Sequence, residues 1–298
     1  MPIAISIDGV PAAGDAARVS VLDRGFLFGD SVFEVLRTYG GVPFAAREHL
    51  ERLERSCRGL GFAMPASVET IEREVREVIA RSGEPDCYVR VVVTRGLHDV
   101  LPISISPPAS VSPLRVVIAA PLPHVDAAIH AQGVELGTVL AHRPTDRTTA
   151  EGAKISAYVM NMLALAQARA RGAYEALLVD EEGAMSEGSS SNFFVVQGGA
   201  VVTPPPSTGL LVGITRTFAL EACASLGVPV RERVLFTPDV RLADEAFLSS
   251  SIREIVPVVR LDGWTIGDGR PGALTRRIHA RFGELVAAHC AARARADG

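Results

Sequence analysis

The hydrophobic residues in the first third of the chain fall into two kinds of stretch. Four stretches are rich in the β-branched and aromatic residues that favour strands. The clearest is 31–39, SVFEVLRTY, which runs into Gly40 and Gly41, a pair typical of a hairpin turn. The other predicted strands cover residues 2–7, 87–96 and 114–120.

Between these strands, apolar residues recur every three or four positions, as they do on the buried face of a helix. Residues 47–60 show this spacing through Leu50, Leu53, Cys57 and Leu60. A second helix is predicted from Ser67, a residue suited to the position just before a helix, to Arg81. Helices that alternate with strands predict a small α/β domain, which we place at residues 1–121.

A break in the pattern separates this region from the rest of the chain. The stretch PLPHVDAAIHAQG, residues 121–133, contains two prolines between strand-like segments, so we assign residues 122–133 to a linker. A larger second domain is then expected at residues 134–298. Its predicted strands are 134–141, 175–180 and 193–197, and its predicted helices are 156–171, 215–226 and 272–292.

Composition narrows the class of protein. Of the 298 residues, 48% are hydrophobic and 21% are charged, which is ordinary for a globular protein. No stretch approaches the ~18 consecutive apolar residues of a membrane helix, and the N-terminus lacks a signal-peptide pattern, so we expect a cytoplasmic protein. The net charge of -4, without a basic block, argues against nucleic-acid binding. The four cysteines form no CxxC pair, so neither a metal site nor a disulfide framework is expected.

One feature of the composition points to chemistry. Lysine and arginine together number 30, but Lys154 is the only lysine. Arginine replaces lysine well at the surface and in ion pairs, but its pKa above ~12 prevents it from acting as a nucleophilic amine. Lys154 is therefore where amine chemistry is expected, although an arginine-rich genome would also leave few lysines.

Three other clusters contain residues suited to ligand binding, and each has a plainer alternative. In LLVGITR (210–216), Gly213 precedes a helix whose unpaired N–H groups attract a phosphate; the alternative is an ordinary helix start. In FLSSSIREIVPV (247–258), three serines could bind an anion or only form a turn. In MSEGSSSNFFVV (185–196), Glu187 is either a solvated turn carboxylate or one held against a heterocyclic nitrogen, where it would favour the protonated ring.

Taken in order, these clusters resemble the class IV aminotransferases, which are fold-type IV pyridoxal-phosphate enzymes. The resemblance covers nearly the whole chain and implies a two-domain α+β fold like that of D-amino-acid aminotransferase. It also implies a homodimer, and a larger pseudo-barrel domain that binds pyridoxal phosphate beside the small α/β domain. The matching segments are LDRGFLFGDSVFE (22–34), REHLERL (47–53), Lys154, the run through Glu187, Asn192, Phe194, Thr203, Gly213 and Arg216, and ADEAFLSSSIREIVPV (243–258).

The resemblance assigns roles to individual residues. Lys154 matches the lysine that carries pyridoxal 5'-phosphate as a Schiff base and shuttles the proton, and Glu187 matches the partner of the pyridine nitrogen. Arg52 matches the arginine that grips the phosphate. Tyr158, four residues after Lys154, is a candidate partner of the ring hydroxyl, although its offset differs from the branched-chain pattern. The other implied cofactor positions are Leu211 at the ring, Gly213, Ile214 and Thr215 at the phosphate-binding helix start, and Ser250 and Ser251 near the phosphate and the substrate carboxylate.

The implied reaction is a ping-pong transamination, but several substrate classes share the scaffold. FEVLRTY (33–39) and YVR (88–90) are close to segments of branched-chain enzymes, although valine replaces glycine and the serine turn replaces GTA. The Arg-x-His trap of D-amino-acid enzymes is missing from TRGLHDVLP (94–102), where His98 stands without it. The predicted substrate pocket comprises Phe28, Phe33, Arg37, Tyr88, Arg90 and Ser251.

We therefore predict an aminotransferase that moves an amino group between an aliphatic, branched-chain-like amino acid and a 2-keto acid. The alternatives are a D-amino-acid or (R)-amine transaminase, and aminodeoxychorismate lyase on the same scaffold, which needs no keto acid. Arg37 and Arg90 could also form ordinary ion pairs on a strand face. A protein that only binds the cofactor is disfavoured, because binding alone requires neither Lys154 nor Glu187.

Overall fold

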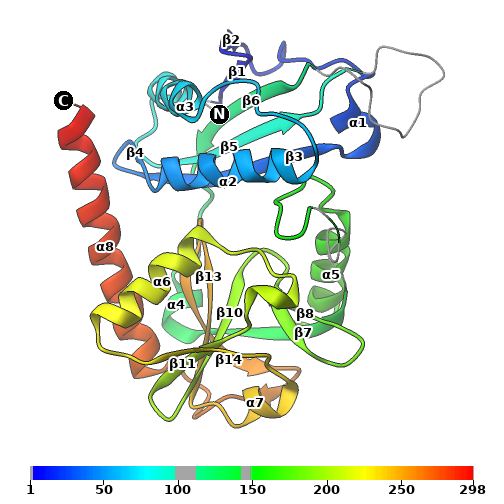
Figure 1. Ribbon diagram of the computed structural model, residues 1–298. Coiled ribbons are helices and arrows are strands. Elements are labelled where there is room, and N and C mark those ends of the chain that lie inside the picture. The colour runs from blue at the N-terminus through cyan, green and yellow to red at the C-terminus, as the bar shows by residue number, and fades with distance from the viewer. Residues whose placement is uncertain (1–2, 98–111, 142–147, 149, 298) are drawn as a thin grey trace. The chain divides into compact units, whose positions relative to one another are not determined.

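The computed structural model describes residues 3–97, 112–141, 148 and 150–297. His98 and most of the predicted polar loop after residue 141 lie outside the described residues. The chain divides into two compact units, which are described separately below (Figure 1). Both units contain helices and strands, which confirms the predicted α+β class. Unit 1 comprises Met1–Pro123, Thr148–Ala157 and His289–Gly298, and unit 2 comprises His124–Arg147 and Tyr158–Ala288.

Unit 1 is built on one antiparallel sheet with the strand order β2-β1-β6-β5-β3-β4. The four strands predicted from the sequence are present as β1, β3, β5 and β6, and the predicted Gly40-Gly41 turn joins β3 to β4 with positive φ at both glycines. The strands are β1 (Ala4–Ile7), β2 (Val10–Ala12), β3 (Ser31–Tyr39), β4 (Val42–Pro43), β5 (Cys87–Thr94) and β6 (Leu114–Pro121).

The two faces of this sheet differ because successive side chains of a strand point to opposite sides. One face packs against α2 (Ala46–Gly59) and α3 (Val68–Ser82), both predicted, and together they bury a hydrophobic core. Ser67 caps α3 by accepting the Thr70 N–H at 3.2 Å. On β3, Glu34 and Leu36 face this side. The other face carries the alternate residues of β3 and β5. The central residues of the core are Val32, Leu36, Leu50, Leu53, Cys57, Ile71, Val75, Val78, Val89, Val91 and Val93.

A short helix, α1 (Arg24–Phe28), was not predicted from the sequence. Its five residues are too few to show a helical period, and its ends are set by local contacts. The Asp23 carboxylate accepts the Gly25 N–H at 2.7 Å, and Gly29 ends the helix in the left-handed region, with φ 67.

Unit 2 contains a nine-stranded sheet in the order β12-β11-β10-β13-β14-β7-β8-β9, with β15 also paired to β14. Three of its pairings are parallel, namely β11 with β12, β14 with β7, and β7 with β8. The strands are β7 (Val134–Leu140), β8 (Glu175–Val179), β9 (Met185–Gly188), β10 (Asn192–Gln197), β11 (Ala200–Thr203), β12 (Val230–Glu232), β13 (Glu245–Ser250), β14 (Glu254–Leu261) and β15 (Trp264–Thr265).

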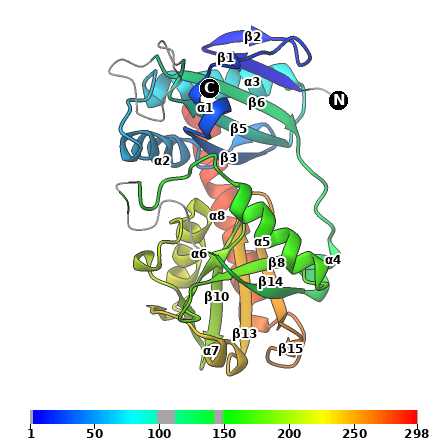
Figure 2. The ribbon, with the colours of Figure 1, turned by 90° about the vertical axis from the view of Figure 1, so that its right-hand side faces the viewer.

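The helices of unit 2 pack against this sheet. Figure 2 shows α5 beside β8, which it contacts together with β7, and α6 contacts β13. Part of the stretch predicted as a linker forms α4. The helix α8 is shared, because its residues up to Ala288 belong to unit 2 and those from His289 belong to unit 1. The helices are α4 (Ala128–Gln132), α5 (Val159–Ala170), the 3-10 turn η1 (Pro206–Thr208), α6 (Ile214–Ser225), α7 (Thr237–Arg241) and α8 (Ala273–Asp297).

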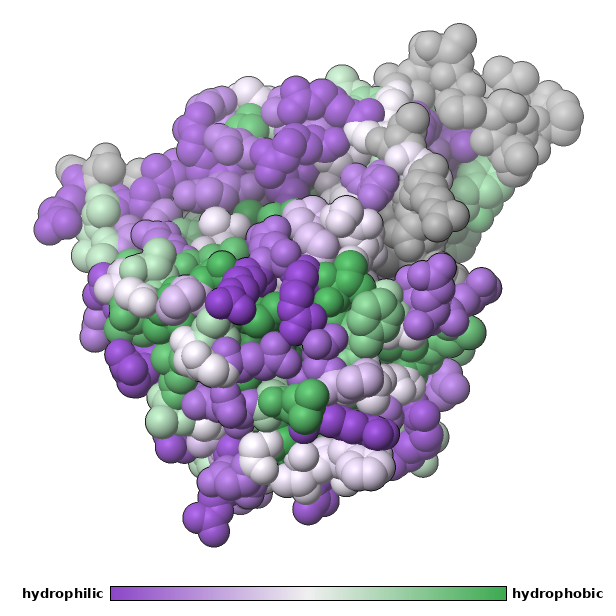
Figure 3. Space-filling model, turned by 60° about the horizontal axis from the view of Figure 1, so that its bottom comes forward, coloured by the Kyte–Doolittle hydropathy of each residue, from purple (hydrophilic) through white to green (hydrophobic). Residues whose placement is uncertain are grey.

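On the face drawn in Figure 3, hydrophilic and hydrophobic side chains are interspersed. Among the described helices, none combines the length and the apolar character needed to cross a membrane.

All four cysteines are buried thiols. Burial raises the pKa of Cys57 to about 12 and that of Cys223 to about 11.

Candidate functional site

The predicted site residues are divided between the two units. Lys154 lies on the segment Thr148–Ala157, which belongs to unit 1 although it follows the first strand of the second sheet in sequence. Glu187 lies in unit 2. The other predicted residues of unit 1 are Phe28, Phe33, Arg37, Arg52, Tyr88 and Arg90, and those of unit 2 are Tyr158, Leu211, Gly213, Ile214, Thr215, Ser250 and Ser251.

The segment around Lys154 is hydrogen-bonded to strand β3. The Phe33 N–H donates to the Lys154 carbonyl oxygen at 3.0 Å, and the Ser156 N–H donates to the Ser31 carbonyl oxygen at 2.8 Å. The Lys154 N–H donates to the Ser56 hydroxyl of α2 at 3.1 Å. Three bonds thus fix the backbone on both sides of the only lysine, so its half-buried side chain starts from a defined position.

The ring of Phe33 brings two cations together on the face of the unit 1 sheet that α2 and α3 do not cover, which we call the open face. The Lys154 Nζ lies 4.6 Å from the ring centroid, and the guanidinium carbon of Arg90 lies 3.9 Å from it. Because both distances are measured to the same ring centroid, the Lys154 amine and the Arg90 guanidinium carbon cannot be farther apart than the two distances added together. A cation over an aromatic face is attracted to its electron-rich centre, so the buried Phe33 ring orients both groups.

The remaining predicted residues of unit 1 are less closely grouped. Tyr88 accepts a long hydrogen bond of 3.5 Å from Arg90. Arg37 faces the same side because it lies opposite Tyr88 in the register of β3 and β5, but its guanidinium sits over Tyr39, 4.3 Å from the ring centroid. Phe28, at the end of α1, is 40% exposed.

Arg52 belongs to a buried network on the helix-covered face of the same sheet. Its Nε and one terminal nitrogen donate to the Glu34 carboxylate at 2.6 and 2.7 Å. His49 lies 2.7 Å from the same carboxylate through Nδ1. Burial alone would raise the pKa of Glu34, but Arg52 and His49 hold it well below its usual range. Burial is also the main reason that the pKa of His49 is lowered, with the charges of Arg52 and Lys154 adding to this.

In unit 2, Glu187 stands at the end of β9 with its carboxylate buried and oriented. Its Oε2 accepts the Leu211 N–H at 3.1 Å and the Asn192 amide at 3.4 Å. The same amide nitrogen of Asn192 donates to the Leu211 carbonyl oxygen at 2.7 Å. Asn192 therefore links the glutamate to the loop before α6.

Asn192 is a site residue whose role was not predicted from the sequence. It appeared in the matching run, but nothing in the local pattern showed what its side chain contacts. The residue that could have indicated this contact is Gly213, because a Cβ atom there would lie 2.1 Å from the Asn192 Oδ1. Only glycine allows the start of α6 to approach this amide so closely.

The helix start that is predicted to bind the phosphate is present as the first turn of α6. Gly213 is the residue before α6, in an extended conformation with φ -69 and ψ 140, and Thr215 is buried in the first turn. On the neighbouring strand β13, Ser249 lies opposite Asn192 in the register with β10, so their side chains share a face. The Ser249 hydroxyl is buried and has no hydrogen-bond partner among the residues that the structure describes. Its neighbours Ser250 and Ser251 were predicted from the sequence instead.

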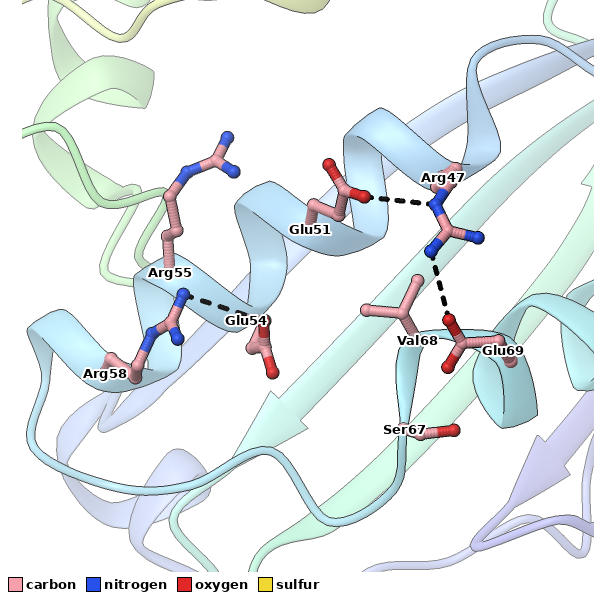
Figure 4. Close-up of a pocket in the computed structure, with 8 residues that line it drawn as sticks. All are labelled: Arg47, Glu51, Glu54, Arg55, Arg58, Ser67, Val68 and Glu69. Atoms are coloured by element: carbon pink, nitrogen blue, oxygen red, sulfur yellow. Dashed lines mark hydrogen bonds and ion pairs between the residues drawn. The ribbon is translucent and has the colours of Figure 1, made fainter.

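A surface pocket of unit 1 contains none of the predicted site residues. Figure 4 shows it between α2 and the start of α3, with charged side chains that largely pair with one another. Arg47 bonds Glu51 and Glu69, each at 3.1 Å, and Arg58 bonds Glu54 at 3.6 Å. Because these charges compensate each other at the surface, we do not assign the pocket a catalytic role.

Comparisons with known proteins decide the family. The family model described as Amino-transferase class IV matches residues 31–261. The chain belongs to the class IV aminotransferase family. It is therefore a transferase enzyme, and the resemblance inferred from its motifs is confirmed.

Individual class IV aminotransferases agree with the chain over nearly its full length. A branched-chain-amino-acid aminotransferase of Escherichia coli (strain K12) is 33% identical over 284 residues, which are 93% of this chain and 91% of that protein. A D-alanine aminotransferase of Listeria monocytogenes is 32% identical over 278 residues, covering 92% and 93%. A branched-chain amino acid aminotransferase from T.th., solved with pyridoxamine 5'-phosphate, has a TM-score of 0.88 at 30% identity, covering 96% and 94%. Both the fold and the transaminase class are thus shared.

Proposed function

We propose that this enzyme moves an amino group between an aliphatic, branched-chain-like amino acid and a 2-keto acid, with pyridoxal 5'-phosphate as its cofactor. The observation that carries the proposal is the position of Lys154, the only lysine, tied to β3 beside Phe33 and Arg90. The substrate class in the names of the two branched-chain relatives supports the donor class, and the pyridoxamine phosphate named for the solved relative supports the cofactor.

The residues of unit 2 suit the ring and the phosphate of such a cofactor. When bound, pyridoxal phosphate supplies a protonated ring that withdraws electrons from the substrate carbon. Glu187 would favour that protonation, because it is a buried carboxylate already oriented by Leu211 and Asn192. The start of α6 offers N–H groups to an anion. The buried Ser249 hydroxyl, which has no hydrogen-bond partner in the described part of the chain, lies on β13 opposite Asn192.

Lys154 supplies the amine that this chemistry requires. We propose that its Nζ holds the cofactor covalently and, once exchanged for the amino donor, moves a proton at the substrate carbon. An arginine at this position could do neither, because it does not give up its proton in proteins. The hydrogen bonds from Phe33 and to Ser56 would keep the backbone of Lys154 in place while the amine moves.

The proposed cofactor contacts of three residues are less direct. Arg52 donates to Glu34 from two of its guanidinium nitrogens, and the proposed contact with the cofactor phosphate would be made by the same guanidinium group. Tyr158, directly before α5, would contact the ring hydroxyl. The hydroxyl of Ser250 already accepts a hydrogen bond of 3.3 Å from Arg253, which leaves its own proton as the donor to a bound anion.

The substrate pocket would be formed in part by the open face of the unit 1 sheet. Phe33 and Tyr88 give it an aromatic lining, and Arg90 gives it a cation that suits a carboxylate. Phe28, Arg37 and Ser251 are proposed to complete it. The D-alanine aminotransferase relative supports a second candidate, in which the donor is a D-amino acid.

We further propose that the enzyme acts as a homodimer in the cytoplasm. The exposed side of α5 supports the dimer, because it presents four large apolar side chains with exposed fractions of 43% or more. Contiguous exposed apolar residues of this kind mark association sites. Light scattering should then give a particle twice the mass of the 31.5 kDa chain, and a 31.5 kDa particle would refute the dimer. The four residues are Val159, Met160, Met162 and Leu163.

A half-reaction screen tests the donor class. The enzyme is loaded with pyridoxal 5'-phosphate, and the absorption of the bound cofactor is followed after L-leucine, D-alanine or (R)-1-phenylethylamine is added. We expect L-leucine to convert the cofactor fastest, with release of the corresponding keto acid. Lys154→Ala is the control that should remain inactive with every donor.

Four results would contradict the proposal in different ways. Conversion by D-alanine alone would establish the second candidate, and conversion by the (R)-amine alone would indicate an amine transaminase. Turnover of a chorismate-derived amine without any keto acid would indicate a lyase. A protein that takes up no pyridoxal phosphate would refute the whole proposal.

A further inference from the structure

A second buried glutamate lies close to Glu187 in the chain's three-dimensional structure. Glu175 begins β8, and its side chain is 1% exposed. Its Oε1 accepts the Ser190 N–H at 2.8 Å and the Ser191 hydroxyl at 2.9 Å, and its Oε2 is bound by Arg253. The arginine and the hydrogen bonds outweigh the effect of burial and lower the pKa of Glu175. The proposed function gives this charged carboxylate no role.

The segment that Glu175 binds is the turn between Glu187 and Asn192. This turn, Ser189–Ser191, joins the end of β9 to the start of β10. Gly188 makes the contact possible, because a Cβ atom there would lie 2.8 Å from the Glu175 Oε1 and 2.3 Å from the Ser191 hydroxyl. The Glu175 carboxylate therefore lies on the inner side of this turn. Glu187 lies on the strand before the turn, and Asn192 lies on the strand after it.

Arg253 ties this turn to a second one. One terminal nitrogen donates to the Ser190 hydroxyl at 2.9 Å, and its Nε donates to the Ser250 hydroxyl at 3.3 Å. Ser250 ends β13 and pairs with Glu254, which begins β14 with φ 59, a left-handed conformation that is unfavourable for residues other than glycine. The arginine thus helps to hold the tight connection between these strands.

The same bonds exclude Arg253 as a site for substrate anions. All three of its guanidinium nitrogens donate to protein oxygens, namely those of Glu175, Ser190 and Ser250. A cation in this position does not attract a carboxylate from solution, because Glu175 already balances its charge. Arg253 instead connects the Ser189–Ser191 turn to the serine turn at Ser250.

We propose that Glu175 and Arg253 are positioning residues, which fix the Glu187 carboxylate by holding the Ser189–Ser191 turn and coupling it to the serine turn at Ser250. The inference rests on the proposed function only in the role given to Glu187, that of setting the proton affinity of the cofactor ring nitrogen. The position of Glu187 itself can be measured without cofactor. Its carboxylate accepts the Leu211 N–H, so the exchange of this amide proton with solvent reports whether the carboxylate stays in place.

The decisive experiment compares amide hydrogen exchange in the full-length apoprotein and in E175Q/R253Q. The double variant removes both charges, so it leaves no unpaired buried ion. We expect the Leu211 amide to exchange at least about tenfold faster in the variant, because local opening of a weakened contact controls exchange. The Thr217 amide, which donates to the Gly213 carbonyl oxygen within α6, should exchange as in wild type. E181Q/R231Q, which removes the same two charges from exposed positions of unit 2, is the matched control and should match wild type at both amides.

The second readout uses pyridoxal 5'-phosphate labelled with 15N in the ring. In the wild-type holoenzyme the ring nitrogen signal should show the protonated form, and in E175Q/R253Q its apparent pKa should fall by about one unit or more. Should the double variant not fold, S190A/S191A keeps the ion pair while removing two hydroxyls. It should then produce smaller changes in the same direction.

The outcomes separate the two claims. Wild-type exchange at Leu211 in a folded E175Q/R253Q, or in S190A/S191A where the double variant does not fold, would overturn the positioning role. Faster exchange at Leu211 together with an unchanged ring-nitrogen titration would overturn its link to the cofactor. Failure of the wild-type protein to take up pyridoxal phosphate would overturn the proposed function, while the exchange result would still decide the positioning role.

Discussion

Glu187 lies just before the Ser189–Ser191 turn and Glu175 binds that turn from β8, yet their carboxylates have different partners. Glu175 is bound by the guanidinium of Arg253 and by serine donors. Glu187 accepts from two neutral N–H groups, those of Leu211 and Asn192. An arginine neutralises a carboxylate as well as orienting it, whereas a neutral N–H donor orients a carboxylate without bringing a positive charge to it. This contrast fits a structural role for Glu175 and the role proposed for Glu187 beside the cofactor ring.

Unit 1 contains a third buried glutamate that resembles Glu175. Glu34 is bound by Arg52 and His49 on the helix-covered face of the sheet, while the neighbouring residue of β3, Phe33, points to the open face with Lys154 and Arg90. In each unit, a glutamate that is paired with an arginine thus lies next to residues that are proposed to take part in catalysis. Removing single charges should separate effects on stability from effects on turnover.

The largest effect is expected from Glu187→Gln. This variant keeps the shape of the side chain and removes its charge, so the ring nitrogen would lose its anionic partner. We expect kcat to fall by about two to three orders of magnitude, the size typical for the loss of one preorganised electrostatic partner, while the apoprotein keeps its melting temperature. Steady-state kinetics and thermal melting would check both. A variant with wild-type kcat would show that the charge at Glu187 is not used.

Glu34→Gln should show the opposite profile, with its main effect on stability. Removing one partner of a buried ion pair leaves the other charge without compensation, which costs roughly 3–5 kcal/mol. Urea denaturation of the apoprotein, followed by circular dichroism, should show a loss of this size in the free energy of unfolding. If the loss were as small as that of a surface substitution, the Glu34–Arg52 pair would not be the structural element described above.

The pH dependence of stability provides a weaker test of the same pair. The pKa of Glu34 is lowered in the folded state, so its contribution is fully present above the unfolded value near 4.5 and is lost as the pH falls below it. The lowered pKa of His49 acts in the same direction, starting below 6.5, because the unfolded chain takes up the proton more readily. Unfolding midpoints should therefore fall from about pH 6.5 downwards. In Glu34→Gln the decline below pH 4.5 should be shallower; an equally steep decline would contradict this assignment.

The smallest effect is expected from Glu69→Gln. Glu69 pairs with Arg47 at 3.1 Å, but both side chains are about half exposed or more, and exposed ion pairs contribute little to stability. The urea midpoint and kcat should both match those of wild type. A clear loss in either would show that the charged pocket in Figure 4 has a role that we have not assigned.

Much of the secondary structure could be predicted because the hydrophobic pattern is regular. The β-branched and aromatic residues of β3 and β5 and the helical spacing of apolar residues in α2 each identify an element, and the structure has these elements within a few residues of the predicted bounds. Short elements were missed. The helix α1 depends on the Asp23 cap and not on a period, and β9 has only four residues.

Only those residues of the candidate site that stand out in the local sequence could be predicted. Lys154 was singled out by composition and Glu187 by its run of small residues, but their contacts depend on segments far apart in sequence. Nothing in the sequence around Asn192 shows that its amide bonds the carbonyl oxygen of Leu211, 19 positions later. In the same way, the bond between Glu175 and Arg253 spans 78 positions, so only the folded sheet brings them together.

The most direct test of the account uses the single lysine. The protein is incubated with pyridoxal 5'-phosphate, reduced with borohydride, digested and analysed by mass spectrometry. Lys154 and the N-terminus are the only amines of the chain that could be modified. We predict that the cofactor mass is found on one peptide, the one that contains Lys154, and that Lys154→Arg carries none. Modification of the N-terminus alone, or no modification, would contradict the claim that Lys154 holds the cofactor.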